Sequence, residues 1–198
     1  MDQEVLKVFS EYTKNWDWDA FRKGKVLISF SAIPGAGKTT VAKQLAERFN
    51  LARINKDEIH DVMVRLSQAH NEDLLKEVVQ MIVNRLSSLG KVILQDSSVD
   101  RKYDQMAAWA EKAEYKFIVI HIEATKETLQ ERIQARNKEG ASEYLKELPR
   151  WWDEHQTFIT MHKPDFLIQE DNFDADVQGL IQSLNSSLSL SSDSAESR

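Results

Sequence analysis

Residues 32–39 have the residue types and the spacing of a loop that holds phosphate groups. They read Ala32-Ile33-Pro34-Gly35-Ala36-Gly37-Lys38-Thr39. The two glycines let the backbone curl so that successive N–H groups point inward, toward an anion. The lysine ammonium can reach the terminal phosphates of a nucleoside triphosphate, and the threonine hydroxyl can bind Mg²⁺. Ala32 stands where the first glycine of the pattern is usual, and alanine is also compact.

The segments on either side of this loop are those that the pattern requires. Residues 25–31 form a nearly continuous apolar run, as expected of a strand buried on both faces. A helix is predicted from Thr39 to about Phe49, and its N-terminus adds a positive partial charge behind the loop. We therefore expect ATP to bind at one contiguous set of residues. The set comprises Pro34, Gly35, Ala36, Gly37, Lys38, Thr39 and Thr40.

Asp96 is the second candidate metal ligand, after Thr39. It ends the apolar run of residues 91–95, as the acidic residue of a Walker B element does. Such a carboxylate holds Mg²⁺, directly or through water, or orients the threonine hydroxyl. Capping of a helix that begins near Asp100 is an alternative that is compatible with the metal role.

Asp57 is the candidate general base. It follows the second predicted strand, residues 51–55, at the edge of the sheet where ligands bind in open α/β folds. A carboxylate there can accept the proton of a hydroxyl that attacks the γ-phosphate. The alternative is that Asp57 is the N-cap of the following helix. The run Asn55–Glu58 does not match the guanine-reading pattern Asn-Lys-x-Asp, in either its position or its spacing.

Arg132 and Arg136 are four residues apart in a predicted helix, so they share one face. They precede a connection, residues 138–149, that contains Gly140 and Pro149. Two guanidinium groups there can close over the phosphates and neutralise charge during transfer, together with Lys38. A solvated helix face is the alternative. Four further cations are candidates for contacts to the acceptor: His60, Arg65, Arg101 and Lys102.

Apolar segments of strand length alternate along the chain with segments of helical periodicity. This alternation predicts an α/β fold in three layers, a parallel sheet with helices on both faces. The strands are expected at residues 25–31, 51–55, 91–96, 116–122 and 166–169. We divide the chain into an N-terminal helical arm (1–24), one main domain (25–185) and a serine-rich tail (186–198). The composition of the tail predicts disorder, and the aromatic residues of the arm are expected to pack on the domain or to bind a partner.

Composition excludes several classes of protein. The chain of 198 residues has no cysteine, which removes disulfides, thiolate metal sites and cysteine nucleophiles. No apolar run has the roughly 20 residues of a membrane helix, and the N-terminus lacks the pattern of a signal peptide. We therefore expect a cytoplasmic protein. The net charge of −6 argues against a broad face for a nucleic-acid duplex, although a small pocket for one nucleic-acid end remains open.

Taken together, these motifs resemble those of the polynucleotide-kinase-like and zeta-toxin-like branch of P-loop kinases, which are small AAA-type ATP-binding kinases. The matching pieces are Pro34–Thr40, Asn55–Glu58, Asp96-Ser97-Ser98, Arg132 and Arg136, spread over residues 25–140. The resemblance implies a P-loop NTPase fold with a five-stranded parallel sheet and a small helical lid. It also implies ATP and Mg²⁺ as cofactors, Asp57 as the base, and contact between Arg136 and the donor phosphates. The family often has arginine where this chain has Lys56 and His60, and both positions concern the acceptor.

Three hypotheses about function remain open at this point. The first is an ATP-dependent kinase whose acceptor is the hydroxyl of a nucleic-acid 5′ end, a nucleotide-sugar or a small metabolite. The second is an ATPase or nucleotide-binding switch, and the third is an interaction module with a degenerate P-loop. Asp57 and the two lid arginines favour the first, and the intact Lys38-Thr39 pair argues against the third. The residues predict neither the acceptor nor the oligomeric state.

Overall fold

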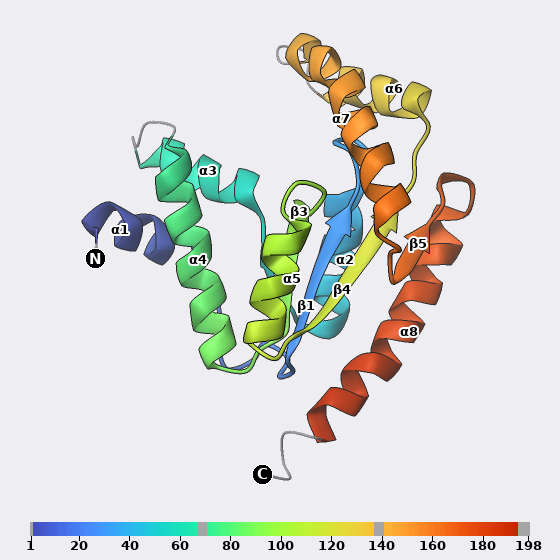
Figure 1. The fold of residues 1–198 in the computed structure, drawn as a ribbon. Helices are drawn as coiled ribbons and strands as arrows, with labels where there is room; N and C mark the ends of the chain where they lie inside the picture. Colours follow the sequence, from blue (N-terminus) through green and yellow to red (C-terminus); the bar gives the residue numbers. More distant parts are fainter. Residues whose placement is uncertain (1, 67–70, 137–140, 194–198) are drawn as a thin grey trace.

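Five parallel strands form the centre of the molecule, and helices cover both faces of the sheet (Figure 1). The computed structural model describes residues 2–66, 71–136 and 141–193. The strands are β1 (Val26–Ser31), β2 (Ala52–Ile54), β3 (Ile93–Ser98), β4 (Lys116–Ile122) and β5 (Phe166–Ile168). Their order in the sheet is β2-β3-β1-β4-β5. The predicted α/β fold with a five-stranded parallel sheet is confirmed.

The helices follow the strands in the alternation that the sequence predicts. They are α1 (Gln3–Tyr12), α2 (Lys38–Phe49), α3 (Lys56–Arg65), α4 (Glu72–Ser88), α5 (Tyr103–Lys112), α6 (Lys126–Arg136), α7 (Ala141–Met161) and α8 (Phe173–Asp193), with the short 3₁₀ helix η1 (Glu170–Asn172). Helices α6 and α7 rise above the carboxyl ends of β1 and β4, as expected of a helical lid (Figure 1). The site must therefore lie between this lid and the edge of the sheet.

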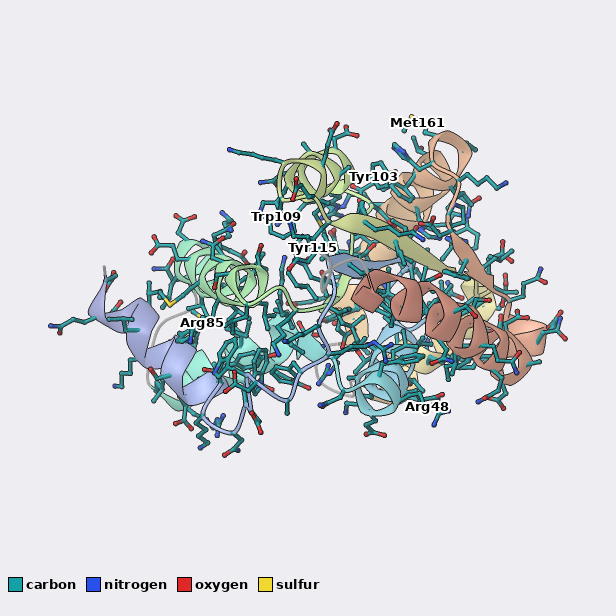
Figure 2. The ribbon with its side chains drawn as sticks, turned by 90° about the horizontal axis from the view of Figure 1, so that it is seen from below. Arg48, Arg85, Tyr103, Trp109, Tyr115 and Met161 are labelled. Carbon is teal, nitrogen blue, oxygen red and sulfur yellow. The ribbon has the colours of Figure 1, made fainter. Side chains whose placement is uncertain are left out.

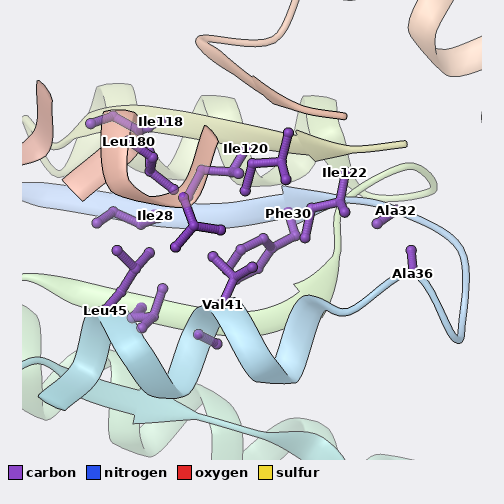
Figure 3. Close-up of a cluster of buried hydrophobic side chains, with 14 of the residues drawn as sticks. Ile28, Phe30, Ala32, Ala36, Val41, Leu45, Ile118, Ile120, Ile122 and Leu180 are labelled. Atoms are coloured by element: carbon purple, nitrogen blue, oxygen red, sulfur yellow. The ribbon is translucent and has the colours of Figure 1, made fainter. Parts of the chain in front are cut away.

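One face of the sheet packs on α2 and α8. Alternate residues of β1 and β4 point to this face, where Ile28, Phe30 and Ile120 meet Val41 of α2 and Leu180 of α8 (Figure 3). All six residues of β1 are buried, which explains why its sequence is a continuous apolar run rather than an alternating one. This packing fixes the end of β1, from which the P-loop departs.

The other face of the sheet packs on α4, on α5 and, at the β2 edge, on the N-terminal arm. Val5 and Val8 of α1 are buried against this layer. The aromatic side chains of the arm pack on one another. Arg85 of α4, which is labelled in Figure 2, places its guanidinium carbon 6.0 Å from the centre of the Trp18 ring. The arm is therefore packed on the domain, and its aromatic residues belong to a hydrophobic cluster.

Two segments differ from the predicted secondary structure. Residues 141–149 are part of α7 rather than a connection, because Leu148 is buried while Pro149 faces solvent. The carbonyl that Pro149 leaves without an N–H partner can then be satisfied by water. Residues 138–140 lie outside the described residues. The whole of α7 thus serves as one long element of the lid.

The tail is the second difference. Helix α8 continues to Asp193, so the predicted disorder from residue 186 is wrong over residues 186–193, and residues 194–198 lie outside the described residues. Leu184 and Leu188 are one helical turn apart and both fully buried, so the apolar stripe of the helix continues into the serine-rich segment. Composition alone misses such a stripe.

Leu188→Ala tests this packing. Because the side chain is fully buried against the α2 face of the sheet, we expect the free energy of unfolding to fall by about 2–4 kcal/mol. The measurement is urea denaturation, with Ser186→Ala on the exposed face of the same turn as the control, expected within about 0.5 kcal/mol of wild type. Equal stabilities of the two variants would contradict a packed α8 terminus.

Candidate active site

The P-loop joins the buried end of β1 to the first turn of α2. Gly35 and Gly37 have φ angles of +93° and +110°, which side-chain-bearing residues rarely adopt. Gly37 is also the N-cap of α2 and brings no side-chain oxygen to the helix N-terminus. The first N–H groups of a helix have no partner within the helix, so this terminus can bind an anion. Ala32 is buried at the strand end, where a compact residue suffices.

Lys38 and Thr40 occupy the first turn of α2. The Lys38 ammonium lies 3.3 Å and 3.2 Å from the carbonyl oxygens of Ala32 and Ile33, so the side chain folds back over its own loop. The Thr40 side chain is exposed, and its N–H donates to the Gly37 carbonyl. An ammonium group in this position faces the loop that the glycines shape.

Thr39 and Asp96 are brought together by the pairing of β1 with β3. The Thr39 hydroxyl lies 3.3 Å from Oδ1 of Asp96, and the carboxylate is almost fully buried. Mg²⁺ commonly takes one or two protein oxygens and completes its shell with phosphates and water. The hydroxyl and the carboxylate fit this requirement, and among the described residues no cluster of three or more acidic or histidine ligands offers another metal site. Asp96 belongs to β3, while α5 begins only at Tyr103, so the alternative helix-capping role does not apply.

The second oxygen of Asp96 is held by two residues that sequence reasoning did not identify. Oδ2 accepts hydrogen bonds of 2.6 Å from Nη1 of Arg53 and of 2.6 Å from Nδ2 of Asn55. The Arg53 guanidinium also binds Glu58. Arg53 lies on β2 and Asn55 directly follows this strand. Because the two are two residues apart, their side chains lie on the same face of the sheet, where both reach Asp96 of the neighbouring strand β3. Polar residues at this spacing at the end of a buried strand were the only signal available.

Asp57 lies in the first turn of α3, directly after β2. The N-cap of this helix is Asn55, whose Oδ1 accepts from the Glu58 N–H at 2.9 Å. The alternative capping role of Asp57 is therefore wrong, and its carboxylate is exposed at the carboxyl edge of the sheet. Lys56 precedes Asp57, and its pKa is lowered, mainly by burial and secondly by the ammonium of Lys102.

Arg132 connects the lid to the P-loop. Its guanidinium lies 3.4 Å from the Gly35 carbonyl and 3.3 Å from the Glu170 carboxylate, which follows β5. Burial opposes the charged form of Glu170, but hydrogen bonds from Thr125 and Thr128 and the charge of Arg132 lower its pKa. Arg136 ends α6, and its side chain lies outside what the structure describes.

A cavity of about 320 Å³ adjoins the P-loop on the β4 side. Its wall includes Ile33 of the loop, Trp152 of α7 and two buried histidines, His121 of β4 and His155 of α7. The two imidazole rings stack with centroids 4.9 Å apart. His155 Nδ1 lies 2.8 Å from Oδ2 of Asp100, so this polar group joins α7 to the loop after β3. Sequence reasoning singled out neither histidine, because their partners are far away in the chain.

These features agree with comparisons to known proteins. The family described as AAA domain (AAA_33) matches residues 28–157. The chain belongs to this AAA domain family. It carries an α/β P-loop fold, as the alternation and the loop predicted. The matched region includes the P-loop, Asp57, Asp96 and the lid, whereas the N-terminal arm lies outside it.

Three relatives illustrate the similarity. A protein from Pyrobaculum islandicum named cytidylate kinase is 29% identical over 133 residues, which are 62% of this chain and 67% of that protein. Shikimate kinase from Bacteroides thetaiotaomicron superposes with a TM-score of 0.54 at 16% identity, covering 81% of this chain and 98% of the other. A structure from the PezAT toxin–antitoxin system of Streptococcus pneumoniae gives a TM-score of 0.60 at 17% identity, over 86% and 79% of the two chains. At these identities the two structures support the fold alone.

Within residues 2–66, 71–136 and 141–193, no helix combines the length and the apolar character needed to cross a bilayer.

The buried histidine pair makes stability depend on pH. The pKa of His121 is lowered from 6.5 to about 4. Burial is the largest cause, and the neighbouring His155 adds to it, whereas the charge of Asp100 opposes the shift. The folded protein thus disfavours the imidazolium, while the unfolded chain protonates freely below about pH 6.5. His121 therefore contributes stability above pH 6.5 that is lost as the pH falls from 6.5 toward 4.

His121→Asn removes this titration. We expect the variant to lose less stability than wild type between pH 6.5 and pH 4.5, by on the order of 1–2 kcal/mol after allowance for solvent screening. The measurement is urea denaturation of both proteins across this range, with each compared to its own stability at pH 7.5. Parallel curves for the two proteins would contradict a buried neutral His121.

Proposed function

We propose that this protein is an ATP-dependent kinase that moves the γ-phosphate of ATP to a hydroxyl group. The observation that carries the proposal is that Thr39 and Asp96 meet directly behind the P-loop while Arg132 approaches the same loop from the lid. A metal ligand pair, a phosphate loop and a lid cation on one edge of the sheet are the parts that phosphoryl transfer requires.

In the proposed reaction the acceptor oxygen attacks the γ-phosphorus of ATP. A new P–O bond forms, the bond from the γ-phosphorus to the β–γ bridging oxygen breaks, and ADP leaves. Asp57 takes the proton of the hydroxyl, Lys38 and Arg132 balance charge on the phosphates, and Arg136 joins them from the lid. Thr39 and Asp96 would hold Mg²⁺, which would neutralise negative charge on the phosphates.

The acceptor defines the finer hypotheses. Resemblance to the polynucleotide-kinase-like and zeta-toxin-like branch favours a nucleic-acid 5′-hydroxyl or a nucleotide-sugar, and a small metabolite is the third alternative. The identity of 29% to a cytidylate kinase favours a second candidate, transfer to the phosphate of a nucleoside monophosphate. We further propose that the main domain begins near residue 25 and that the arm precedes it. We also propose a cytoplasmic location.

The destination of the label tests the proposal. The protein is incubated with γ-labelled ATP and, separately, with 5′-hydroxyl oligonucleotides, nucleotide-sugars, nucleoside monophosphates and a metabolite extract. A kinase transfers label to one class of acceptor and depends on Mg²⁺. Release of free labelled phosphate at the same rate whatever is offered would instead show an ATPase or a switch.

Asp57→Asn separates the base from nucleotide binding. We expect kcat to fall roughly 10²- to 10⁴-fold because the hydroxyl loses its proton acceptor, while the affinity for ATP stays within about twofold. Asp61→Asn is the matched control, since Asp61 lies one turn later on α3 and is also exposed. Retained transfer, or loss of ATP affinity together with transfer, would contradict the role of Asp57.

Arg132→Ala tests the lid contact. We expect kcat/KM for ATP to fall roughly 10- to 100-fold, because the variant loses a cation beside the phosphate loop. Arg150→Ala is the control, since Arg150 also pairs with a glutamate but on the outer surface of α7. Equal kinetics for the two variants would remove Arg132 from the site.

A further inference from the structure

We infer that the N-terminal arm, through the hydroxyl of Tyr12, positions Arg53 and Asn55 so that they hold the metal-binding carboxylate of Asp96. The inference rests on the proposed function, because it assigns Mg²⁺ to Thr39 and Asp96. It concerns residues 1–24, which lie outside the family match, and it makes the arm part of the machinery of the site.

The two oxygens of Asp96 have separate surroundings. Oδ2 is bound by Arg53 and Asn55 at 2.6 Å each, whereas Oδ1 faces the Thr39 hydroxyl at 3.3 Å. Two short bonds to one oxygen fix the rotation of the carboxylate and leave the other oxygen directed at the P-loop. Groups behind a ligand that set its orientation commonly change metal affinity when they are removed.

Arg53 lies on an edge strand that has little support of its own, and Asn55 directly follows this strand. Strand β2 has three residues, and within the described part of the chain only β3 pairs with it. Its outer edge has backbone groups that require partners. The Tyr12 hydroxyl supplies them, since it donates to the Arg53 carbonyl at 3.2 Å and accepts from the Asn55 N–H at 3.1 Å. One phenol therefore holds the backbone of both residues that bind Asp96.

Tyr12 is itself held in place by the arm. Its ring packs against Trp16 at 5.5 Å, and Trp16 contacts Trp18 and Phe21. Burial is the main cause that raises the pKa of Tyr12 to about 12, so the hydroxyl keeps the proton that it donates. The aromatic cluster thus explains why a tyrosine from outside the domain reaches the sheet edge at a defined position.

Tyr12→Phe tests the inference because it keeps the ring and removes the hydroxyl. We expect the Mg²⁺ concentration that gives half-maximal transfer to rise roughly three- to tenfold, with the KM for the acceptor unchanged. The matched control is Tyr115→Phe, at a residue labelled in Figure 2. Its hydroxyl donates to the Lys91 carbonyl at 3.0 Å on the α4–β3 connection, and Lys91 is not among the groups that bind Asp96. Tyr115→Phe loses one hydrogen bond to the backbone and Tyr12→Phe loses two, so the control reports the purely structural effect of removing a tyrosine hydroxyl.

A second measurement does not depend on catalysis. We expect ATP to raise the Tm of the protein, and Mg²⁺ to increase that shift in wild type and in Tyr115→Phe but less in Tyr12→Phe. Equal Mg²⁺-dependent shifts and equal Mg²⁺ requirements in the two variants would overturn the inference. Absence of transfer in wild type would refute only the proposed reaction, because the thermal shifts still report on the metal-binding carboxylate.

Discussion

The buried carboxylate of Asp96 is the constraint on which the rest of the site depends. A charge removed from water is tolerated only where hydrogen bonds and an opposite charge replace its hydration. Here the replacements come from Thr39 at the start of α2 and from Arg53 and Asn55 at the end of β2. The P-loop helix and the edge strand must therefore both be in place before β3 can carry this residue.

This requirement connects segments that lie far apart along the chain. The P-loop is a local structure, shaped by two glycines and by the N-terminus of α2. Asn55 caps α3 with one side-chain atom and binds Asp96 with another. A single asparagine thus links the orientation of the Asp96 carboxylate to the helix that presents Asp57.

The lid is attached to the same edge of the sheet by polar contacts. Arg132 joins α6 to the P-loop and to Glu170, and the bond between His155 and Asp100 joins α7 to the loop after β3. The Arg101–Glu154 ion pair lies beside that bond. Ionic and hydrogen-bonded contacts of this kind can rearrange when a highly charged ligand arrives, whereas the apolar layers beneath the sheet cannot.

The sequence by itself determined the α/β alternation, the P-loop and the pairing of Thr39 with Asp96, because these follow from periodicity and from motifs with fixed spacing. It did not identify Asn55 as the N-cap of α3, because neighbouring polar residues, Asp57 among them, compete for that role. It also failed at the tail, where composition predicted disorder but Leu188 continues a buried stripe of α8. Only the tertiary structure decided which groups surround Asp96, that Tyr12 supports the β2 edge, and that His121 stacks on His155. These contacts join residues 34 to 43 positions apart, so they depend on how the sheet orders its strands, a property that no local pattern of residues contains.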